Sequence, residues 1–178
     1  MKNILKKFYY PKIKILMWSY GGEGKTTFLF NCIKNYNLPY LIPTVGLNFE
    51  SIIYKNKEFL FCDFGGGYIV KELIEHYTNN DILMFFIDSS IIQKDLHEYN
   101  LKELNRCIKY FEEKPFLIVI NKIDIRKKST NKLIEMYQIE RLFNKKGKFG
   151  IVECSSVTNE GVEKIKMWLD DASKEIIK

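Results

Sequence analysis

Two uninterrupted apolar runs constrain the fold of this chain most. Residues 82–88 read I-L-M-F-F-I-D, and residues 116–120 read F-L-I-V-I. Both have the length of a strand. Neither alternates between apolar and polar residues, as a strand with one exposed face does, and such continuous runs are typical of parallel strands covered by helices on both sides. Between them, residues 96–113 carry apolar side chains at helical spacing and stop before Pro115. This order predicts a βαβ unit in a parallel sheet.

The rest of the chain continues this alternation of strands and helices. Further strands are predicted at residues 12–19, 47–54, 58–63 and 149–154. Further helices are predicted at residues 28–36, 69–77 and 161–177. Lys55, Asn56 and Lys57 separate two of the strands, which predicts a β-hairpin. We therefore predict one α/β domain with a doubly wound, mostly parallel sheet of about six strands, one antiparallel hairpin, and helices on both faces.

Composition and charge indicate a globular protein without a nucleic-acid partner. The chain has 178 residues, of which 46% are hydrophobic, enough for one domain with a buried core. Its net charge of +6 raises the question of nucleic-acid binding. The basic residues are spread over residues 2–14, 126–132 and 145–148, however, without interleaved aromatic residues in a nucleic-acid motif. We expect a solvated, lysine-rich surface.

The cysteines and the lengths of the apolar runs indicate a cytoplasmic protein. The cysteines form neither a C-x-x-C pair nor a zinc-binding pattern, and we expect reduced core thiols at Cys32, Cys62, Cys107 and Cys154. No apolar run reaches the roughly 18 residues of a transmembrane segment. Residues 1–11 are too polar for a secretory signal.

Residues 19–27, here called the glycine loop, read S-Y-G-G-E-G-K-T-T. They differ by one residue from the phosphate-binding pattern G-x-x-x-x-G-K-[ST], because Ser19 stands where the first glycine belongs. In this pattern Lys25 would bind the β- and γ-phosphates, and the Thr26 hydroxyl would bind Mg²⁺. The predicted phosphate-binding residues of the loop are Gly21, Gly22, Glu23, Gly24, Lys25, Thr26 and Thr27. The alternative is a glycine turn between a strand and a helix, which has no need of the adjacent Lys-Thr pair.

The sequence N-K-I-D at residues 121–124 follows the predicted strand 116–120. The Asp124 carboxylate could accept hydrogen bonds from N1–H and the 2-amino group of guanine. Adenine lacks that amino group, and its N1 is an acceptor, so such a site would discriminate strongly between the bases. We predict Asn121, Lys122 and Asp124 as guanine-binding residues; the alternative is an ordinary polar loop.

Two further motifs could bind Mg²⁺ and the γ-phosphate. Asp63 ends a predicted strand and could hold Mg²⁺ through a water molecule, and the Gly66 N–H could bind the γ-phosphate. Thr44 precedes the hairpin and could reach Mg²⁺ only while a γ-phosphate holds its loop. Taken singly, these residues could equally be an ordinary turn and an ordinary loop threonine.

In this order the motifs resemble those of the Ras-like small GTPases, and within them the ADP-ribosylation factor (Arf) and Arf-like family. The resemblance extends over about residues 13–169. I-P-T-V-G-L-N-F-E at residues 42–50 resembles the first switch, and D-F-G-G at residues 63–66 with E-H-Y at residues 75–77 resembles the second. C-S-S at residues 154–156 resembles the C-A-T element, which implies that the Ser155 N–H contacts the guanine oxygen.

The resemblance implies a molecular switch that cycles between GDP and GTP with Mg²⁺ and recruits effectors in vesicle trafficking. It implies exchange factors and GTPase-activating proteins as partners, and a hairpin that slides with nucleotide state. Gly67 stands where the family has the glutamine that orients the attacking water. Two functions therefore stay open, a switch with slow hydrolysis and a persistently GTP-bound scaffold, and we predict no catalytic residue.

Residues 1–11 are predicted to be a basic amphipathic segment before a GTPase domain at residues 12–178. Ile4, Leu5 and Phe8 can share one helical face, so residues 2–10 could bind an anionic membrane weakly. The alternative is a tail packed on the protein. Lys2 replaces the glycine that is myristoylated in many Arf proteins, and the C-terminal E-I-I-K has no prenylation cysteine. We therefore expect neither lipid.

Overall fold

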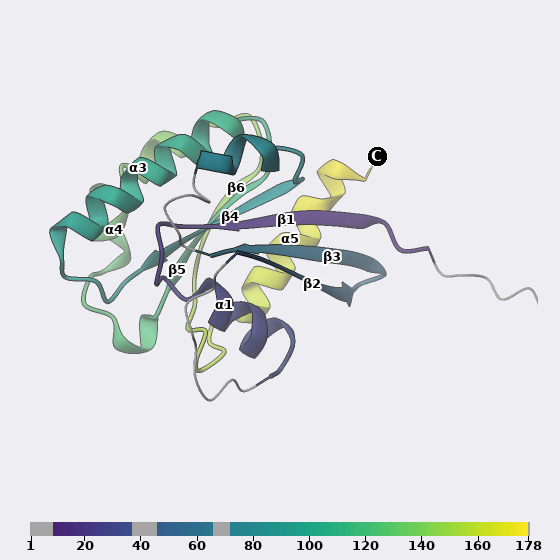
Figure 1. Ribbon diagram of the computed structural model, residues 1–178, viewed down its shortest axis with the longest axis horizontal. Helices are drawn as coiled ribbons and strands as arrows, with labels where there is room; N and C mark the ends of the chain where they lie inside the picture. The colour runs from purple at the N-terminus through teal and green to yellow at the C-terminus, as the bar shows by residue number, and fades with distance from the viewer. Residues whose placement is uncertain (1–8, 37–45, 66–71, 178) are drawn as a thin grey trace, which may run out of the picture.

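A computed structural model describes residues 9–36, 46–65 and 72–177 of the chain. In these residues six strands form one sheet in the order β2-β3-β1-β4-β5-β6, with helices on both sides (Figure 1). The strands are β1 Lys12–Trp18, β2 Leu47–Tyr54, β3 Lys57–Phe64, β4 Ile82–Asp88, β5 Phe116–Asn121 and β6 Phe149–Glu153. Among the strands of the described residues, β2 and β3 pair antiparallel, and the other neighbours are parallel. The predicted fold class is confirmed.

Helices of two groups cover the two faces of this sheet. One face carries α3 (Lys94–Tyr110) and α4 (Thr130–Met136); the other carries α1 (Lys25–Thr27) and α5 (Val162–Ile176) (Figure 1). α1 continues without a break into a π-helix, η1 (Phe28–Ile33). Short 3₁₀ helices lie at η2 (Glu72–Tyr77), η3 (Ile123–Ile125) and η4 (Ile139–Leu142).

Alternating residues of the central strands divide the interior into two cores. Ile13 and Ile15 of β1 contribute to the core beneath α1 and α5, which includes Leu169. Leu16 contributes to the core beneath α3 and α4, which includes Leu104. Because both faces are covered, all seven residues of β4 are buried, as its continuous apolar sequence predicts.

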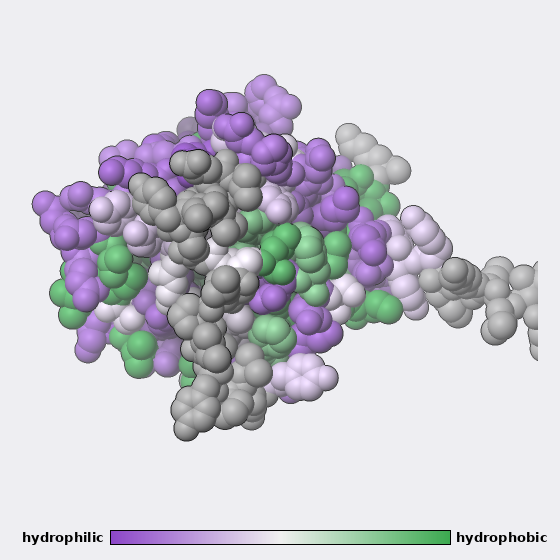
Figure 2. All heavy atoms as spheres, in the orientation of Figure 1, coloured by the Kyte–Doolittle hydropathy of each residue, from purple (hydrophilic) through white to green (hydrophobic). Residues whose placement is uncertain are grey.

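The hairpin between β2 and β3 forms the edge of the sheet. Lys55 and Asn56 have φ of 47° and 59°, the left-handed values that a two-residue hairpin turn needs, so Lys57 already belongs to β3. Asp170 of α5 accepts from Lys57 Nζ at 2.5 Å and from Lys55 Nζ at 3.1 Å, which fastens this turn to α5. Phe49 is 54% exposed on β2. Figure 2 shows a mostly hydrophilic face with apolar side chains gathered over this side of the sheet.

Several predicted boundaries differ from the structure. The first helix begins at Lys25 rather than at residue 28, because the last three residues of the glycine loop form its first turn. Asn121 belongs to β5, and the helix predicted at residues 96–113 spans Lys94–Tyr110. α4 was not predicted. It begins after Ser129, whose side chain accepts from the Lys132 N–H, and it buries Leu133 within an otherwise polar sequence.

Candidate functional site

The carboxyl ends of four strands bring the predicted motifs to one edge of the sheet. The glycine loop follows β1, Asp63 lies near the end of β3, the N-K-I-D residues end and follow β5, and residues 154–156 follow β6. In the strand order β1 lies between β3 and β4, so the chain leaves β1 toward β2 on one side of it and later crosses to β4 on the other side. In open α/β sheets, ligands bind at such a point. The fold therefore places those predicted residues that the structure describes where a ligand site is expected.

The backbone of the glycine loop needs glycine at two of its positions. Gly22 and Gly24 have φ of 87° and 88°, which L-residues with a side chain rarely adopt. A Cβ on Gly24 would also lie 2.6 Å from Asn121 Nδ2. Gly24 is therefore required both by its conformation and by the close approach of β5.

Inside the glycine loop, Ser19 and Glu23 contact one another. The Ser19 hydroxyl donates to Glu23 Oε2 at 2.6 Å, and the Gly21 N–H donates to the same oxygen at 2.7 Å. Lys25 Nζ donates to Ser19 Oγ at 2.5 Å. All three side chains are buried, with 4%, 1% and 5% exposed for Ser19, Glu23 and Lys25. The sequence shows two polar residues four positions apart, but it does not show that they meet.

Asn121 joins the glycine loop to the segment after β6. Its Nδ2 donates to the Glu23 carbonyl oxygen at 2.7 Å. Its Oδ1 accepts from the Ser156 N–H at 3.1 Å, from Ser156 Oγ at 2.9 Å and from Cys154 Sγ at 3.4 Å. The side chain is fully buried. Asn121 therefore holds the surroundings of the site together through its side chain.

Lys122 continues this connection on the other side of the loop. Its Nζ donates to the Gly22 carbonyl oxygen at 2.8 Å and pairs with Asp88 Oδ2 at 2.6 Å. Asp88 is buried at the end of β4, and its Oδ1 accepts from the Ser90 N–H and hydroxyl. Asp88 was not predicted. An acid that directly follows a buried strand was the available signal.

Asp124 and Ser155 lie at the same edge in different situations. Asp124 is exposed, and none of the described residues donates a hydrogen bond to its carboxylate. Ser155 is buried, and its N–H donates to the Glu160 carbonyl oxygen at 3.0 Å. The Asp124 carboxylate is therefore free to accept from a ligand, whereas the Ser155 N–H would have to leave or share its partner.

Asp63 and Thr26 form the predicted magnesium position. Thr26 Oγ1 donates to Asp63 Oδ2 at 2.7 Å. Asp63 Oδ1 is buried without a hydrogen-bond partner among the described residues. Burial raises the pKa of Asp63, and the Thr26 hydrogen bond and the Lys25 charge oppose that rise. A hydroxyl beside an orphaned carboxylate oxygen fits a cation that prefers oxygen ligands and keeps several waters.

Polar residues of α3 also hold the glycine loop and the end of β1 in place. Asn100 Oδ1 accepts from the Tyr20 N–H at 2.9 Å, and Glu103 Oε2 accepts from Trp18 Nε1 at 2.9 Å. Asn100 and Glu103 are buried on the helix face that meets the sheet. These residues were not predicted, because in the sequence they look like the polar face of an amphipathic helix.

Some predicted residues lie outside the described part of the chain. They are Thr44, Gly66, Gly67 and most of the N-terminal segment 1–11. The E-H-Y sequence does lie within it, in η2. There the Tyr77 ring packs edge-on against Phe64 at the end of β3, with a centroid distance of 4.1 Å.

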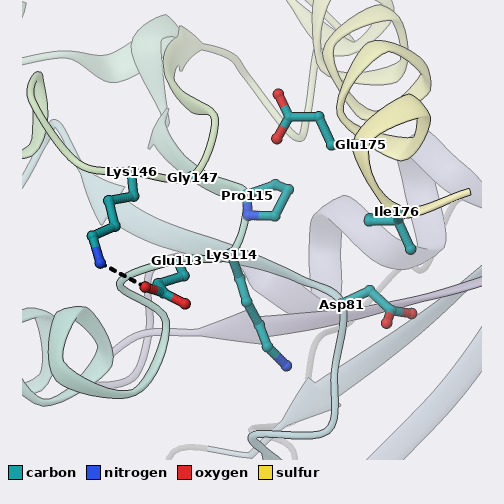
Figure 3. A pocket seen from close by; sticks show the side chains of 8 residues that line it. All are labelled: Asp81, Glu113, Lys114, Pro115, Lys146, Gly147, Glu175 and Ile176. Atoms are coloured by element: carbon teal, nitrogen blue, oxygen red, sulfur yellow. Dashed lines mark hydrogen bonds and ion pairs between the residues drawn. The ribbon is translucent and has the colours of Figure 1, made fainter. Parts of the chain in front are cut away.

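A cavity of about 490 Å³ lies at the other end of the strands, where their amino ends meet (Figure 3). Asp81, Pro115 and Gly147 line it just before the starts of β4, β5 and β6. Lys146 pairs with Glu113 at 2.7 Å, and the side chain of Lys114 is held by the carbonyl oxygens of residues 78 and 80. The lysines of this cavity are thus already partnered, and none of the predicted motif residues lies in it.

Comparison with known proteins decides the family. The sequence profile of the ADP-ribosylation factor family matches residues 1–173. The chain belongs to this family. Within the Ras superfamily it is an Arf-like small GTPase, and the family binds guanine nucleotides.

Individual relatives agree with this assignment. "ADP-ribosylation factor-like protein 2" of Dictyostelium discoideum is 31% identical over 175 residues, which cover 94% of this chain and 91% of the relative. "ADP-ribosylation factor K" of the same organism is 28% identical over 164 residues, which cover 90% and 85%. The structure of the Arl6 BBS3 small GTPase from Trypanosoma brucei with bound GppNp shares the fold, with a TM-score of 0.76, 24% identity, and 92% and 98% of the two chains covered.

The described helices of this Arf-family chain include none that is long and apolar enough to cross a membrane.

Proposed function

We propose that this Arf-family chain is a guanine-nucleotide switch that cycles between GDP- and GTP-bound states and recruits effector proteins in membrane trafficking. One observation carries the proposal. Asn121 ties the glycine loop to the segment after β6, while Asp124, three residues on, presents at the same edge a carboxylate with no partner among the described residues. This combination supports a site that binds phosphate at one end and a base with two adjacent donors at the other.

The residues of the site divide the work of binding between them. Asp124 would accept from N1–H and the 2-amino group of guanine, and the Ser155 N–H would contact the guanine oxygen. Lys25 and the N–H groups of the glycine loop would bind the phosphates. Thr26, Thr44 and Asp63 would hold Mg²⁺, which supplies positive charge against the terminal phosphates. Gly66 would donate its N–H to the γ-phosphate.

Hydrolysis would be slow in this proposal. In-line attack needs a positioned water, and Gly67 has no side chain that could orient one. The same observation favours a second candidate, a persistently GTP-bound scaffold that binds partners without turnover. The rate of GTP loss separates the two functions, since only the switch returns to the GDP state by itself or with an activating partner.

Competition binding tests the base preference. We expect GTP and GDP to displace a fluorescent guanine nucleotide, with ATP and ADP weaker by at least about a hundredfold, because an adenine would leave Asp124 unpaired. Displacement by ATP at the same concentration as GTP would refute the assignment.

Asp124→Asn tests the role of the carboxylate in base recognition. The amide presents one acceptor and one donor, so guanine nucleotides should weaken, while xanthine nucleotides, which have a carbonyl at C2, should gain. Because Asp124 is exposed and has no partner among the described residues, this variant should keep the thermal stability of the parent. A gain for xanthine in a stable variant would place the base at Asp124.

A further inference from the structure

The glycine loop contains a buried carboxylate close to the position expected for bound phosphates. Glu23 is 1% exposed, and its Oε2 accepts from the Ser19 hydroxyl and from the Gly21 N–H. The loop's N–H groups are the donors expected to meet phosphate oxygens, and one of them is already directed to this side chain. Glu23 therefore satisfies part of the loop from within.

Ser19 connects this carboxylate to the lysine of the loop. A hydroxyl has one hydrogen to donate and two lone pairs to accept. Ser19 Oγ uses the hydrogen toward Glu23 and accepts from Lys25 Nζ, so one oxygen lies between the acid and the ammonium group. The residue that replaces the first glycine is thus the link between Glu23 and Lys25.

We infer that Ser19 and Glu23 act as positioning residues that hold Lys25 back from the terminal phosphates. They thereby lower the affinity for nucleotide and speed its release. The inference rests on the proposed function and deepens it. A buried negative charge repels the polyphosphate, and in the low dielectric of the loop that repulsion is screened far less than in water. The hydrogen bonds of Lys25 and Gly21 to this pair must also be shared or broken when phosphate binds.

The effect should depend on the number of phosphates. Lys25 is expected to meet the β- and γ-phosphates and not the α-phosphate. The Ser19–Glu23 pair should therefore oppose GTP most, oppose GDP less, and leave GMP nearly unaffected. A role limited to keeping the loop folded would change the binding of all three nucleotides together, so the ratio of their affinities distinguishes the two explanations.

The test compares dissociation constants and release rates of GMP, GDP and a non-hydrolysable GTP analogue for the parent and three variants. Glu23→Gln removes the charge and keeps an oxygen acceptor for Ser19 and Gly21. Glu163→Gln is the control, because it removes the same charge from α5, where Glu163 accepts from Tyr54. The double variant Ser19→Gly with Glu23→Ala removes the pair altogether. It provides an independent test should Glu23→Gln fold poorly.

For Glu23→Gln we expect GDP to bind about tenfold more tightly than to the parent, which is the scale of one partly screened charge interaction. The affinity for the GTP analogue should rise more, and the affinity for GMP should stay within about twofold of the parent value. The double variant should change in the same direction, and Glu163→Gln should match the parent. Unchanged or weakened GDP binding relative to GMP in both loop variants would overturn the inference while leaving the proposed function intact. If the folded parent and all variants bound no guanine nucleotide, both would fall.

Discussion

Replacing Asn121 with alanine should destabilise the protein even when no nucleotide is present. The side chain is fully buried and makes its contacts within the protein, to the Glu23 carbonyl oxygen and to Ser156 and Cys154. It therefore connects the glycine loop, 98 residues before Asn121 at Glu23, with the segment after β6, 35 residues after Asn121 at Ser156. The alanine variant removes that connection without removing an apolar side chain from either core.

The size of the effect follows from the groups left without a partner. Asn121→Ala strands the Glu23 carbonyl, the Ser156 N–H and the Ser156 hydroxyl. Each buried polar group left unsatisfied costs about 1–3 kcal/mol, and a water admitted to the space recovers part of the loss. We expect the free energy of unfolding to fall by about 3–5 kcal/mol, a large share of the roughly 5–15 kcal/mol typical of a domain.

Urea unfolding of nucleotide-free protein, followed by circular dichroism, measures this loss. Nucleotide must be removed first, because a ligand that binds only the folded state adds its own stabilisation. Asp124→Ala is the control, since its exposed carboxylate has no partner among the described residues, and its stability should stay within about 0.5 kcal/mol of the parent. A loss below about 1 kcal/mol for Asn121→Ala, or equal losses for both variants, would refute the reasoning.

Three further predictions concern turnover, magnesium and membrane contact. Gly67→Gln should raise single-turnover GTP hydrolysis above the parent rate, itself expected below about 10⁻⁴ s⁻¹, with nucleotide affinity nearly unchanged; brisk hydrolysis by the parent would contradict this. Asp63→Asn should abolish the slowing of GDP release by Mg²⁺. Because burial raises the pKa of Asp63, the nucleotide-free parent should also lose stability as pH rises from about 3.9 through that raised pKa, and the variant should show no such loss. Deleting residues 2–10 should reduce flotation with anionic vesicles, and equal recovery would exclude this segment as the membrane contact.

The strands could be predicted from sequence because burial on both faces leaves a distinctive run of apolar residues. β4 spans the predicted residues 82–88, and the hairpin lies where its turn residues placed it. α4 was not predicted, because it buries Leu133 within an otherwise basic, polar segment, with the buried Tyr137 just after its end. Helices of this kind depend on tertiary packing more than on local pattern.

The site was predictable in position but only partly in its contacts. Motif order placed the glycine loop, Asp63 and Asn121 at one edge, since the carboxyl ends of parallel strands meet there. Spacing alone could not show that the Ser19 hydroxyl meets Glu23 or that the Ser155 N–H donates to Glu160. Such pairings depend on side-chain rotamers and loop conformation, which only the folded chain determines.

Amide hydrogen exchange with and without nucleotide tests the central claim most directly, because it reports both binding and location. With GDP and Mg²⁺ we expect slower exchange in three segments that meet at one edge of the sheet, residues 19–27, 121–125 and 154–157. ADP and Mg²⁺ at the same concentration should leave these segments unchanged. Equal protection by ADP, or GDP protection confined to the cavity edge around residues 113–115 and 146–147, would contradict the account.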